Sequence, residues 1–408
     1  MEIFERLESE VRSYCRSFPA VFTTASGPYM YDENGRRYID FFCGAGTLNF
    51  GHNHPYIKER VIDFLRGDSV VHALDMHTEV KREFIEKFER VILAKRGLEY
   101  KLQFTGPTGT NAVEAALKLA RKVKKRNTVF ALTGAFHGMT LGSLALTSDR
   151  TSRAGAGVPL DNVVKIPSPS VFPGVDTVDY AKTLIENDHS GVDVPAAIII
   201  ETLQAEGGVY RLGDECLRRF RALCDEHDIL LIVDDIQVGV CRTGPYFSFE
   251  SAGIVPDMVL LSKSLSGYGF PMSLLLIKPE IDVWKPGEHN GTFRGNQIAF
   301  SAASAALDLV CDCDVENEVG RKSLIISEFL TDRIADDAVI IRGAGMIYGI
   351  DFTGGQDVAL IQKRCFENGL IIERAGAGDR VLKIMPPLLI DDETLVGGLK
   401  IIDNAIHA

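Results

Sequence analysis

Two short apolar segments of this 408-residue chain each end on a charged residue. Residues 229–233 (ILLIV) run into Asp234, and residues 258–261 (MVLL) run through Ser262 into Lys263. Continuous apolar runs of this length, bounded by polar residues, are typical of parallel strands that are buried on both faces. Because ligands bind at the carboxyl ends of such strands, we expect Asp234 and Lys263 to face one pocket.

The types of these two residues indicate a particular chemistry. A lysine that forms a Schiff base and an aspartate that pairs with a pyridinium nitrogen are the groups that pyridoxal phosphate chemistry requires. Charged residues at strand ends are also common as solvated loop residues, and the pocket rule is the only support for this pair by itself. Asp234 and Lys263 therefore indicate a cofactor site only as a hypothesis, which needs support from other motifs.

A segment rich in glycine and hydroxyl residues, 105–111 (TGPTGTN), precedes a predicted helix over residues 112–123. Its Gly109 and Thr110 would stand at the helix N-terminus, where free backbone N–H groups and the positive end of the helix dipole favour a phosphate. An ordinary N-terminal cap explains the same residues more simply. The segment is thus a candidate phosphate site whose assignment depends on the other motifs.

Two further segments follow predicted strands. Phe136 and His137 come after the strand at residues 128–132, and an aromatic ring at a strand end can stack on a flat cofactor. A core phenylalanine beside a hydrogen-bonded histidine is an equally good interpretation. Residues 201–208 (ETLQAEGG) follow the strand at residues 197–201, and their carboxylates and amide predict either a substrate rim or a surface loop.

Composition and charge exclude several classes of protein. The length predicts two or three domains, and 46% hydrophobic with 25% charged residues is ordinary for a soluble globular enzyme. The net charge of −12 argues against a nucleic-acid partner. We expect no signal peptide and no membrane span, which would need ~20 consecutive apolar residues. The eight cysteines lack paired metal-ligand spacing, which predicts reduced thiols, a cytoplasmic location and no metal site.

The order of the predicted elements indicates an α/β fold. Through the central part of the chain, helical periodicity alternates with short apolar strands, which favours a mixed, mostly parallel sheet with helices on both faces. A helix over residues 298–309 follows, and then two strand-like segments that flank a helix near residues 357–367. The pattern predicts a large domain over residues 51–297 and a smaller one formed by residues 1–50 and 298–408.

At this point the motifs resemble a known family. Residues 234–239 (DDIQVG), 242–244 (RTG) and 261–263 (LSK) resemble the class III aminotransferases of fold type I, and the likeness extends from residues 51–55 (GHNHP) to 386–388 (PPL). The order and spacing of these motifs are highly specific. The resemblance implies a fold type I pyridoxal phosphate-dependent transferase with a large α/β domain, a small α+β domain from both termini, and at least a homodimer.

The resemblance also implies roles for individual residues. Lys263 resembles the lysine that binds the cofactor and transfers the proton, Asp234 the partner of the pyridinium nitrogen, and Gln237 a neighbour of the phenolic oxygen. Glu206 resembles a gate over the site for the substrate carboxylate. Further cofactor contacts are implied for Gly109, Thr110, Phe136, His137 and Thr292, the last of which would reach the phosphate of the neighbouring subunit.

Within the family, residues 4–14, 135–144 and 262–272 resemble the L-2,4-diaminobutyrate:2-oxoglutarate aminotransferases. This subgroup transfers the amino group of L-glutamate to L-aspartate 4-semialdehyde. Lys383 stands where the general family usually carries an arginine that clamps a carboxylate, and a lysine lacks the bidentate fork. The lysine favours the subgroup over ornithine or acetylornithine enzymes and makes Lys383 a candidate substrate residue.

The residues leave three alternatives open. A different ω-aminotransferase would act on ornithine, acetylornithine or 4-aminobutyrate, and a semialdehyde aminomutase would use the same scaffold without a co-substrate. A noncatalytic cofactor-binding protein could also keep the fold, although it need not keep Lys263 and Asp234. One further departure is Cys241, which stands where glycine is common before Arg242, and we expect it to pack in the core.

Overall fold

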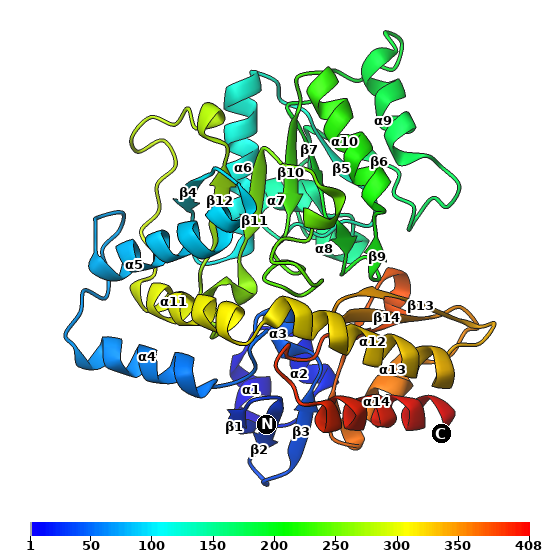
Figure 1. Cartoon of the computed structure of the whole chain (residues 1–408). Helices are drawn as coiled ribbons and strands as arrows, with labels where there is room; N and C mark the ends of the chain where they lie inside the picture. The colour runs from blue at the N-terminus through cyan, green and yellow to red at the C-terminus, as the bar shows by residue number, and fades with distance from the viewer. Residues whose placement is uncertain (1) are drawn as a thin grey trace.

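The computed structural model describes residues 2–408, and a seven-stranded sheet forms its centre (Figure 1). β10 (Leu230–Asp234) pairs in parallel with β7 (Ala197–Ile200) on one side and with β11 (Met258–Leu261) on the other. β12 is antiparallel to both of its neighbours, so the sheet is mixed and mostly parallel, as predicted. The other strands are β4 (Lys101–Phe104), β5 (Val129–Leu132), β6 (Val163–Ile166) and β12 (Leu274–Ile277).

Alternate residues of the sheet pack on two different sets of helices. On one face, Ile232 and Leu260 pack with buried residues of α6 (Gly109–Lys124). On the other face, Val233 and Val259 pack with three further helices. Every residue of β10 and β11 is buried, which explains their continuous apolar sequences. The helices of the second face are α5 (Glu79–Phe88), α10 (Asp214–Glu226) and α11 (Gln297–Asp312).

Both ends of the chain lie together beside the large sheet, in the lower part of Figure 1. β3 (Arg37–Asp40) pairs in parallel with β15 (Leu370–Ile371), which joins the first fifty residues to the C-terminal region. A separate four-stranded sheet has the order β13-β14-β17-β16. The bounds are β1 Phe22–Ser26, β2 Tyr29–Asp32, β13 Val339–Ala344, β14 Ile347–Phe352, β16 Glu373–Ala375 and β17 Val381–Ile384.

The helices of the C-terminal region follow the predicted pattern. The helix expected over residues 298–309 is α11, and the one expected near residues 357–367 is α13. Within residues 2–408, no helix combines the length and apolar character needed to cross a membrane. The remaining helices are α1 (Glu2–Leu7), α2 (Tyr14–Ser17), α3 (Cys43–Gly46), α4 (Pro55–Arg66), α7 (Leu141–Leu146), α8 (Arg150–Ala154), α9 (Thr177–Glu186), α12 (Val315–Arg333), α13 (Val358–Glu367) and α14 (Asp392–His407).

The buried Arg242 joins the loop after β10 to distant parts of the chain. Its guanidinium donates to the carbonyl oxygens of Met346 (3.0 Å) and Pro386 (2.6 Å) and to Asn49 Oδ1 (2.6 Å). Cys241 beside it is buried, as predicted, and has a φ of 67°. Glycine adopts such a left-handed backbone without a Cβ clash, which agrees with the glycine that the resemblance implied at this position.

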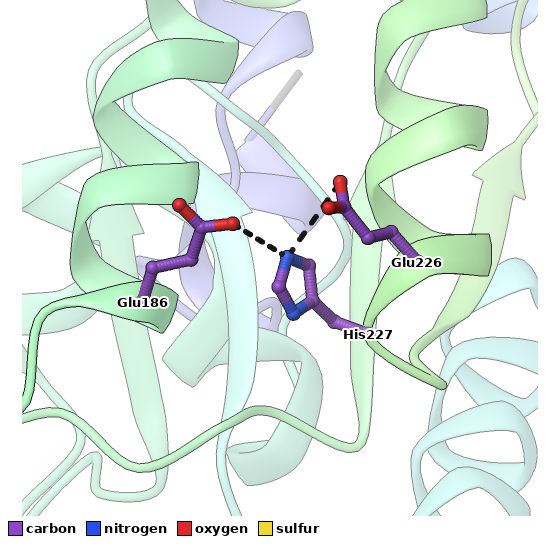
Figure 2. A group of neighbouring side chains, drawn as sticks. All are labelled: Glu186, Glu226 and His227. Atoms are coloured by element: carbon purple, nitrogen blue, oxygen red, sulfur yellow. Dashed lines mark ion pairs between the residues drawn. The ribbon is translucent and has the colours of Figure 1, made fainter.

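A cluster of ion pairs ties α9 to α10 on the outer side of the molecule (Figure 2). His227 Nε2 lies 3.2 Å from Glu186 Oε1 and 3.9 Å from Glu226 Oε2. Lys182 Nζ lies 3.4 Å from Glu186 and 3.2 Å from Glu226. Because the lysine already supplies the positive charge that the two carboxylates attract, we assign this cluster a structural role.

Candidate active site

A cavity of about 370 Å³ opens at the carboxyl ends of β10 and β11, where the strand pattern predicted a pocket. Its size lies in the usual range for small-molecule sites. Lys263 and Asp234 both line it, so the first expectation from the sequence is confirmed. The other predicted residues in its wall are Gly109, Thr110, Phe136, His137, Glu206 and Gln237.

Asp234 ends β10 with both carboxylate oxygens engaged. Its Oδ1 accepts the Ile236 N–H (3.2 Å), and its Oδ2 lies 2.7 Å from His137 Nδ1. The backbone N–H of His137 donates to Thr147 Oγ1 (3.0 Å), and its Nε2 is buried without a hydrogen-bond partner. The histidine thus fixes the orientation of a carboxylate that faces the cavity, and a carboxylate so held suits a cationic ring nitrogen.

Lys263 follows β11 and begins a short 3₁₀ turn, Lys263–Ser266, with a φ of 44°. The serines on either side are anchored, since Ser262 Oγ donates to Met272 O and Ser264 Oγ donates to Gly46 O, both at 2.7 Å. Burial lowers the pKa of Lys263, an effect that the carboxylate of Glu206 opposes and Lys383 reinforces. A lowered pKa increases the share of neutral amine, which is the nucleophilic form.

The first turn of α6 forms the candidate phosphate site. A Cβ atom on Gly109 would lie 2.8 Å from Ile236 Cδ1, so the glycine lets the helix pack closely against the side chain of Ile236. Thr110 Oγ1 lies 2.6 Å from Thr140 Oγ1, which in turn donates to Glu114 Oε1 (2.6 Å). This hydroxyl chain fixes Thr110 beside the free N–H groups of the helix N-terminus.

Glu201 holds the segment that carries the candidate stacking ring. The backbone N–H of Phe136 donates to Glu201 Oε1 (2.8 Å). Burial, with the nearby charge of Asp234, raises the pKa of Glu201 well above its usual value. Glu201 lines the cavity, as the predicted substrate rim requires, but Gln204 from the same motif is buried and donates to Thr133 O (3.0 Å). The motif is therefore part cavity wall and part structural support.

Glu206 projects into the cavity from the hairpin of β8 (Leu203–Gln204) and β9 (Tyr210–Arg211). Gln237 Nε2 donates both to Glu206 Oε1 (3.0 Å) and to Ala45 O (2.9 Å). The amide of Gln237 therefore holds the glutamate in addition to lining the cavity. Burial opposes ionisation of Glu206, but the charges of Lys383 and Lys263 outweigh it and lower the pKa of Glu206 to about 2.

Lys383 lies behind Glu206 and outside the cavity wall. Its side chain is completely buried on β17, with Nζ 2.6 Å from Glu206 Oε1 and 3.0 Å from Glu373 Oε2. The sequence did not reveal Glu373. Glu373 and Lys383 face each other across the β16–β17 pair, and this register could not be read from the short strand β16.

Tyr14 is a second residue near this site that sequence motifs did not single out. Desolvation of its hydroxyl group raises its pKa, and the charges of Glu373 and Glu206 act in the same direction. Thr292, by contrast, is exposed and lies outside the cavity wall. Thr292 therefore does not reach the cavity of its own subunit, and its expected role in the neighbouring subunit stays a prediction.

Comparison with known proteins decides the family. The model of the family described as Aminotransferase class-III matches residues 12–406. The chain belongs to the class III aminotransferases. It is 50% identical to the diaminobutyrate--2-oxoglutarate transaminase of Bordetella parapertussis, over the whole chain and 95% of that protein. It is 51% identical to the enzyme of the same name from Wolinella succinogenes, over the whole chain and 96% of that protein.

Solved structures of aminotransferases share the fold. The ornithine aminotransferase of Toxoplasma gondii superimposes with a TM-score of 0.88 at 25% identity, covering all of this chain and 94% of that one. A second structure of that enzyme is described with partial occupancy of PLP at its active site, with a TM-score of 0.87 at 25% identity, covering 99% of this chain and 92% of that one. A Bacillus anthracis aminotransferase has a TM-score of 0.89 at 23% identity, covering all of this chain and 97% of that one.

The cavity of this class III aminotransferase fits pyridoxal phosphate, the cofactor of the family. An amine with a lowered pKa and an oriented carboxylate stand at the ends of adjacent strands, the two groups that the aldehyde and the ring nitrogen need. Gly109 and Thr110 line the cavity at the N-terminus of α6, where free backbone N–H groups suit a phosphate. The enzyme is a pyridoxal phosphate-dependent aminotransferase.

Proposed function

We propose that this class III aminotransferase transfers the amino group of L-glutamate to L-aspartate 4-semialdehyde, giving L-2,4-diaminobutyrate and 2-oxoglutarate. The observation that supports it most strongly is the identity of about half of all residues, over the whole chain, with proteins named diaminobutyrate--2-oxoglutarate transaminase. The position of Lys383 between Glu206 and Glu373 also supports the proposal. The site then holds a cation for the carboxylate of an amino acid substrate and an anion for its ammonium group.

The residues of the cavity divide the work of the proposed reaction. Bound pyridoxal phosphate supplies an electron sink for the negative charge that develops on the substrate carbon. Asp234, oriented by His137, would keep the ring nitrogen cationic. Lys263 would bind the cofactor in the resting enzyme and, once displaced by the substrate amine, move a proton between the two carbons that exchange it. Phe136 would stack on the ring, and the first turn of α6 would hold the phosphate.

The same site must accept two amino donors in opposite directions of the reaction. Glutamate presents a carboxylate at its far end, whereas diaminobutyrate presents an ammonium and a carboxylate. Lys383 is the cation for either carboxylate, and Glu206 lies between it and the cavity. We infer that Glu206 moves aside when glutamate binds, because it stands between Lys383 and the cavity and blocks an incoming carboxylate from the lysine.

Isotope transfer tests the proposed function. The enzyme is supplied with ¹⁵N-labelled glutamate and aspartate 4-semialdehyde, and the products are identified by mass spectrometry. The label should appear on the nitrogen at C4 of diaminobutyrate, in equal amount with 2-oxoglutarate. A clear preference for ornithine, acetylornithine or 4-aminobutyrate as donor would overturn the choice of substrate, and product formation without glutamate would indicate an aminomutase.

We propose further that the active enzyme is a homodimer or a higher oligomer. Thr292 is exposed, and the neighbouring Phe293 keeps 70% of its surface exposed, which is unusual for a large apolar side chain. A second subunit would bury this segment against the phosphate site. Sedimentation should give at least twice the mass of 44.8 kDa, and Thr292→Val should weaken cofactor binding. A fully active monomer would contradict this proposal.

We propose a cytoplasmic location for the enzyme. All eight cysteines are free thiols in the described structure, and free thiols are typical of reducing compartments. Cell fractionation with an antibody to the chain should recover it with cytoplasmic markers. Recovery in a membrane or extracellular fraction would contradict the proposal.

A further inference from the structure

Two carboxylates share one lysine at the far end of the cavity. Lys383 Nζ lies 2.6 Å from Glu206 Oε1 and 3.0 Å from Glu373 Oε2. Glu373 has a side chain that is 8% exposed, and its Oε2 atom is buried without a hydrogen bond of good geometry. Removing one partner from a buried ion pair is strongly destabilising. If Glu206 moves away from Lys383, Glu373 can therefore keep the lysine paired.

The two carboxylates occupy different places. Glu206 lines the cavity, and 28% of its side chain is exposed there. Glu373 lies outside the cavity wall, directly across the β16–β17 pair from Lys383. Glu206 is therefore the carboxylate that a ligand can touch, and Glu373 is the one that stays with the lysine.

Two carboxylates compete for Lys383 at this site. Glu206 and Glu373 supply two negative charges when both are ionised, and Lys383 supplies one positive charge. Burial raises the pKa of Glu373, against the attraction of Lys383, and the negative charge of Glu206 raises it further. The two carboxylates therefore differ: Glu206 stays ionised beside the cavity and can meet an ammonium group of a ligand, whereas Glu373 is placed to keep the lysine paired in the protein interior.

Diaminobutyrate has such an ammonium group at its α-carbon, and glutamate has none at its far end. If Lys383 had Glu206 as its only counter-ion, Glu206 would be neutralised by the lysine and would attract an ammonium weakly. Because Glu373 also lies within ion-pair distance of the lysine, Glu206 can turn toward a ligand without leaving Lys383 unpaired. Because Glu373 does not line the cavity, its effect on a ligand must pass through Lys383 and Glu206.

We propose that Glu373 is a positioning residue that holds Lys383 and thereby frees Glu206 to bind the α-ammonium of diaminobutyrate. This inference rests on the proposed function and adds the basis of its selectivity. It also assigns the two carboxylates separate tasks: Glu206 contacts the substrate, and Glu373 keeps the buried lysine paired when Glu206 turns to the ligand.

The test compares diaminobutyrate with 4-aminobutyrate, which is the same molecule without the α-ammonium. Single-turnover reactions of the holoenzyme with each amine, followed by the absorbance of the cofactor, give the two specificity constants. In Glu373→Gln, the preference for diaminobutyrate over 4-aminobutyrate should fall by about tenfold to a hundredfold, the range for a hydrogen bond to a charged group. The rate with glutamate should stay the same or rise.

Two variants serve as controls. Glu373→Asp keeps the charge and should restore part of the preference. Glu328→Gln removes a carboxylate from an exposed position of α12 and should leave both constants unchanged. Melting temperature and cofactor affinity, measured on each variant, separate a folding defect from a selective one.

The results of these experiments test the positioning role of Glu373 separately from the proposed aminotransferase reaction. If Glu373→Gln slows both amines equally, or if Glu373→Asp recovers nothing, the positioning role is wrong although the enzyme still makes diaminobutyrate. A wild-type enzyme that does not favour diaminobutyrate over 4-aminobutyrate contradicts the inference directly. Failure of the labelled nitrogen to reach diaminobutyrate in the wild type contradicts the proposed function itself.

Discussion

His137 Nδ1 lies 2.7 Å from Asp234 Oδ2, and both residues are buried in the wall of the cavity. The histidine lies in the loop after β5 and the aspartate ends β10, so the contact links these two parts of the large sheet across the intervening β7. The next residue, Asp235, faces the other way and accepts the Ser248 N–H (3.0 Å). The alternation of a strand thus gives two adjacent aspartates different tasks.

Asp234→Asn should lower kcat by roughly a hundredfold or more, a loss typical of removing one charged group from the stabilisation of a developing charge. The neutral amide cannot keep the ring nitrogen of the cofactor cationic. Asp235→Asn is the matched control, because it makes the same chemical change one residue away and outside the cavity. Steady-state kinetics check the pair, and equal losses of kcat in the two variants would contradict the assignment.

Lys383→Met should destabilise the fold by about 3–5 kcal/mol, because it leaves the buried Glu373 and the partly buried Glu206 without their cation. Urea unfolding measures the change. The triple variant with Glu206→Gln and Glu373→Gln should recover most of this loss, since it removes the uncompensated charges as well. If Lys383→Met alone is as stable as the wild type, the three residues do not form a coupled charge cluster.

Gly207→Ala should disturb Glu206 without unfolding the protein. A Cβ atom at this position would lie 2.5 Å from the carbonyl oxygen of Gly134, so the backbone after Glu206 must shift. Overpacking of this kind costs typically 1–3 kcal/mol, and we expect kcat/KM for glutamate to fall by more than kcat. Gly213→Ala is the control, because a Cβ atom there meets nothing within 4 Å. Unchanged kinetics in Gly207→Ala would argue against a fixed Glu206.

Lys165 provides a pH dependence of stability. Burial, together with the charge of Arg153, lowers its pKa to about 7, and Glu201 opposes this only in part. Between that value and the pKa of 10.5 that an unperturbed lysine has, the unfolded chain binds more protons than the folded one, so this group makes stability rise with pH. Lys165→Met should therefore gain most over the wild type near pH 7 and least near pH 10.

Thermal unfolding at several pH values checks this expectation. The exposed Lys58→Met is the control, and it should differ from the wild type by the same amount at every pH. A Lys165→Met variant whose difference from the wild type is also constant with pH would show that the lysine keeps its ordinary pKa.

The sequence predicted the parts of this site that local pattern determines. Asp234 and Lys263 end continuous apolar strands, and the rule for ligands at strand ends brings them to one cavity. Glu373 could not be found this way, because it lies in a three-residue strand whose partner, Lys383, is ten residues further along the chain. Only the register of β16 on β17 makes them neighbours, and register depends on tertiary packing.

In the large sheet, too, local sequence pattern predicted some strands and missed others. β5, β7, β10, β11 and β12 were expected because each is a run of buried apolar residues. β4 and β6 did not stand out, since each contains a lysine and has partly exposed positions. The division into domains at residues 50 and 297 stays a prediction, which limited proteolysis can test.

The central claim is that the amine of Lys263 binds the cofactor. Reduction of the holoenzyme with borohydride, followed by digestion and mass spectrometry, tests it most directly. The peptide that contains residue 263 should carry the added mass of the reduced cofactor, and Lys263→Ala should lose both this label and the visible absorbance of the bound cofactor. A label on a different lysine, or a yellow and active Lys263→Ala enzyme, would contradict the account.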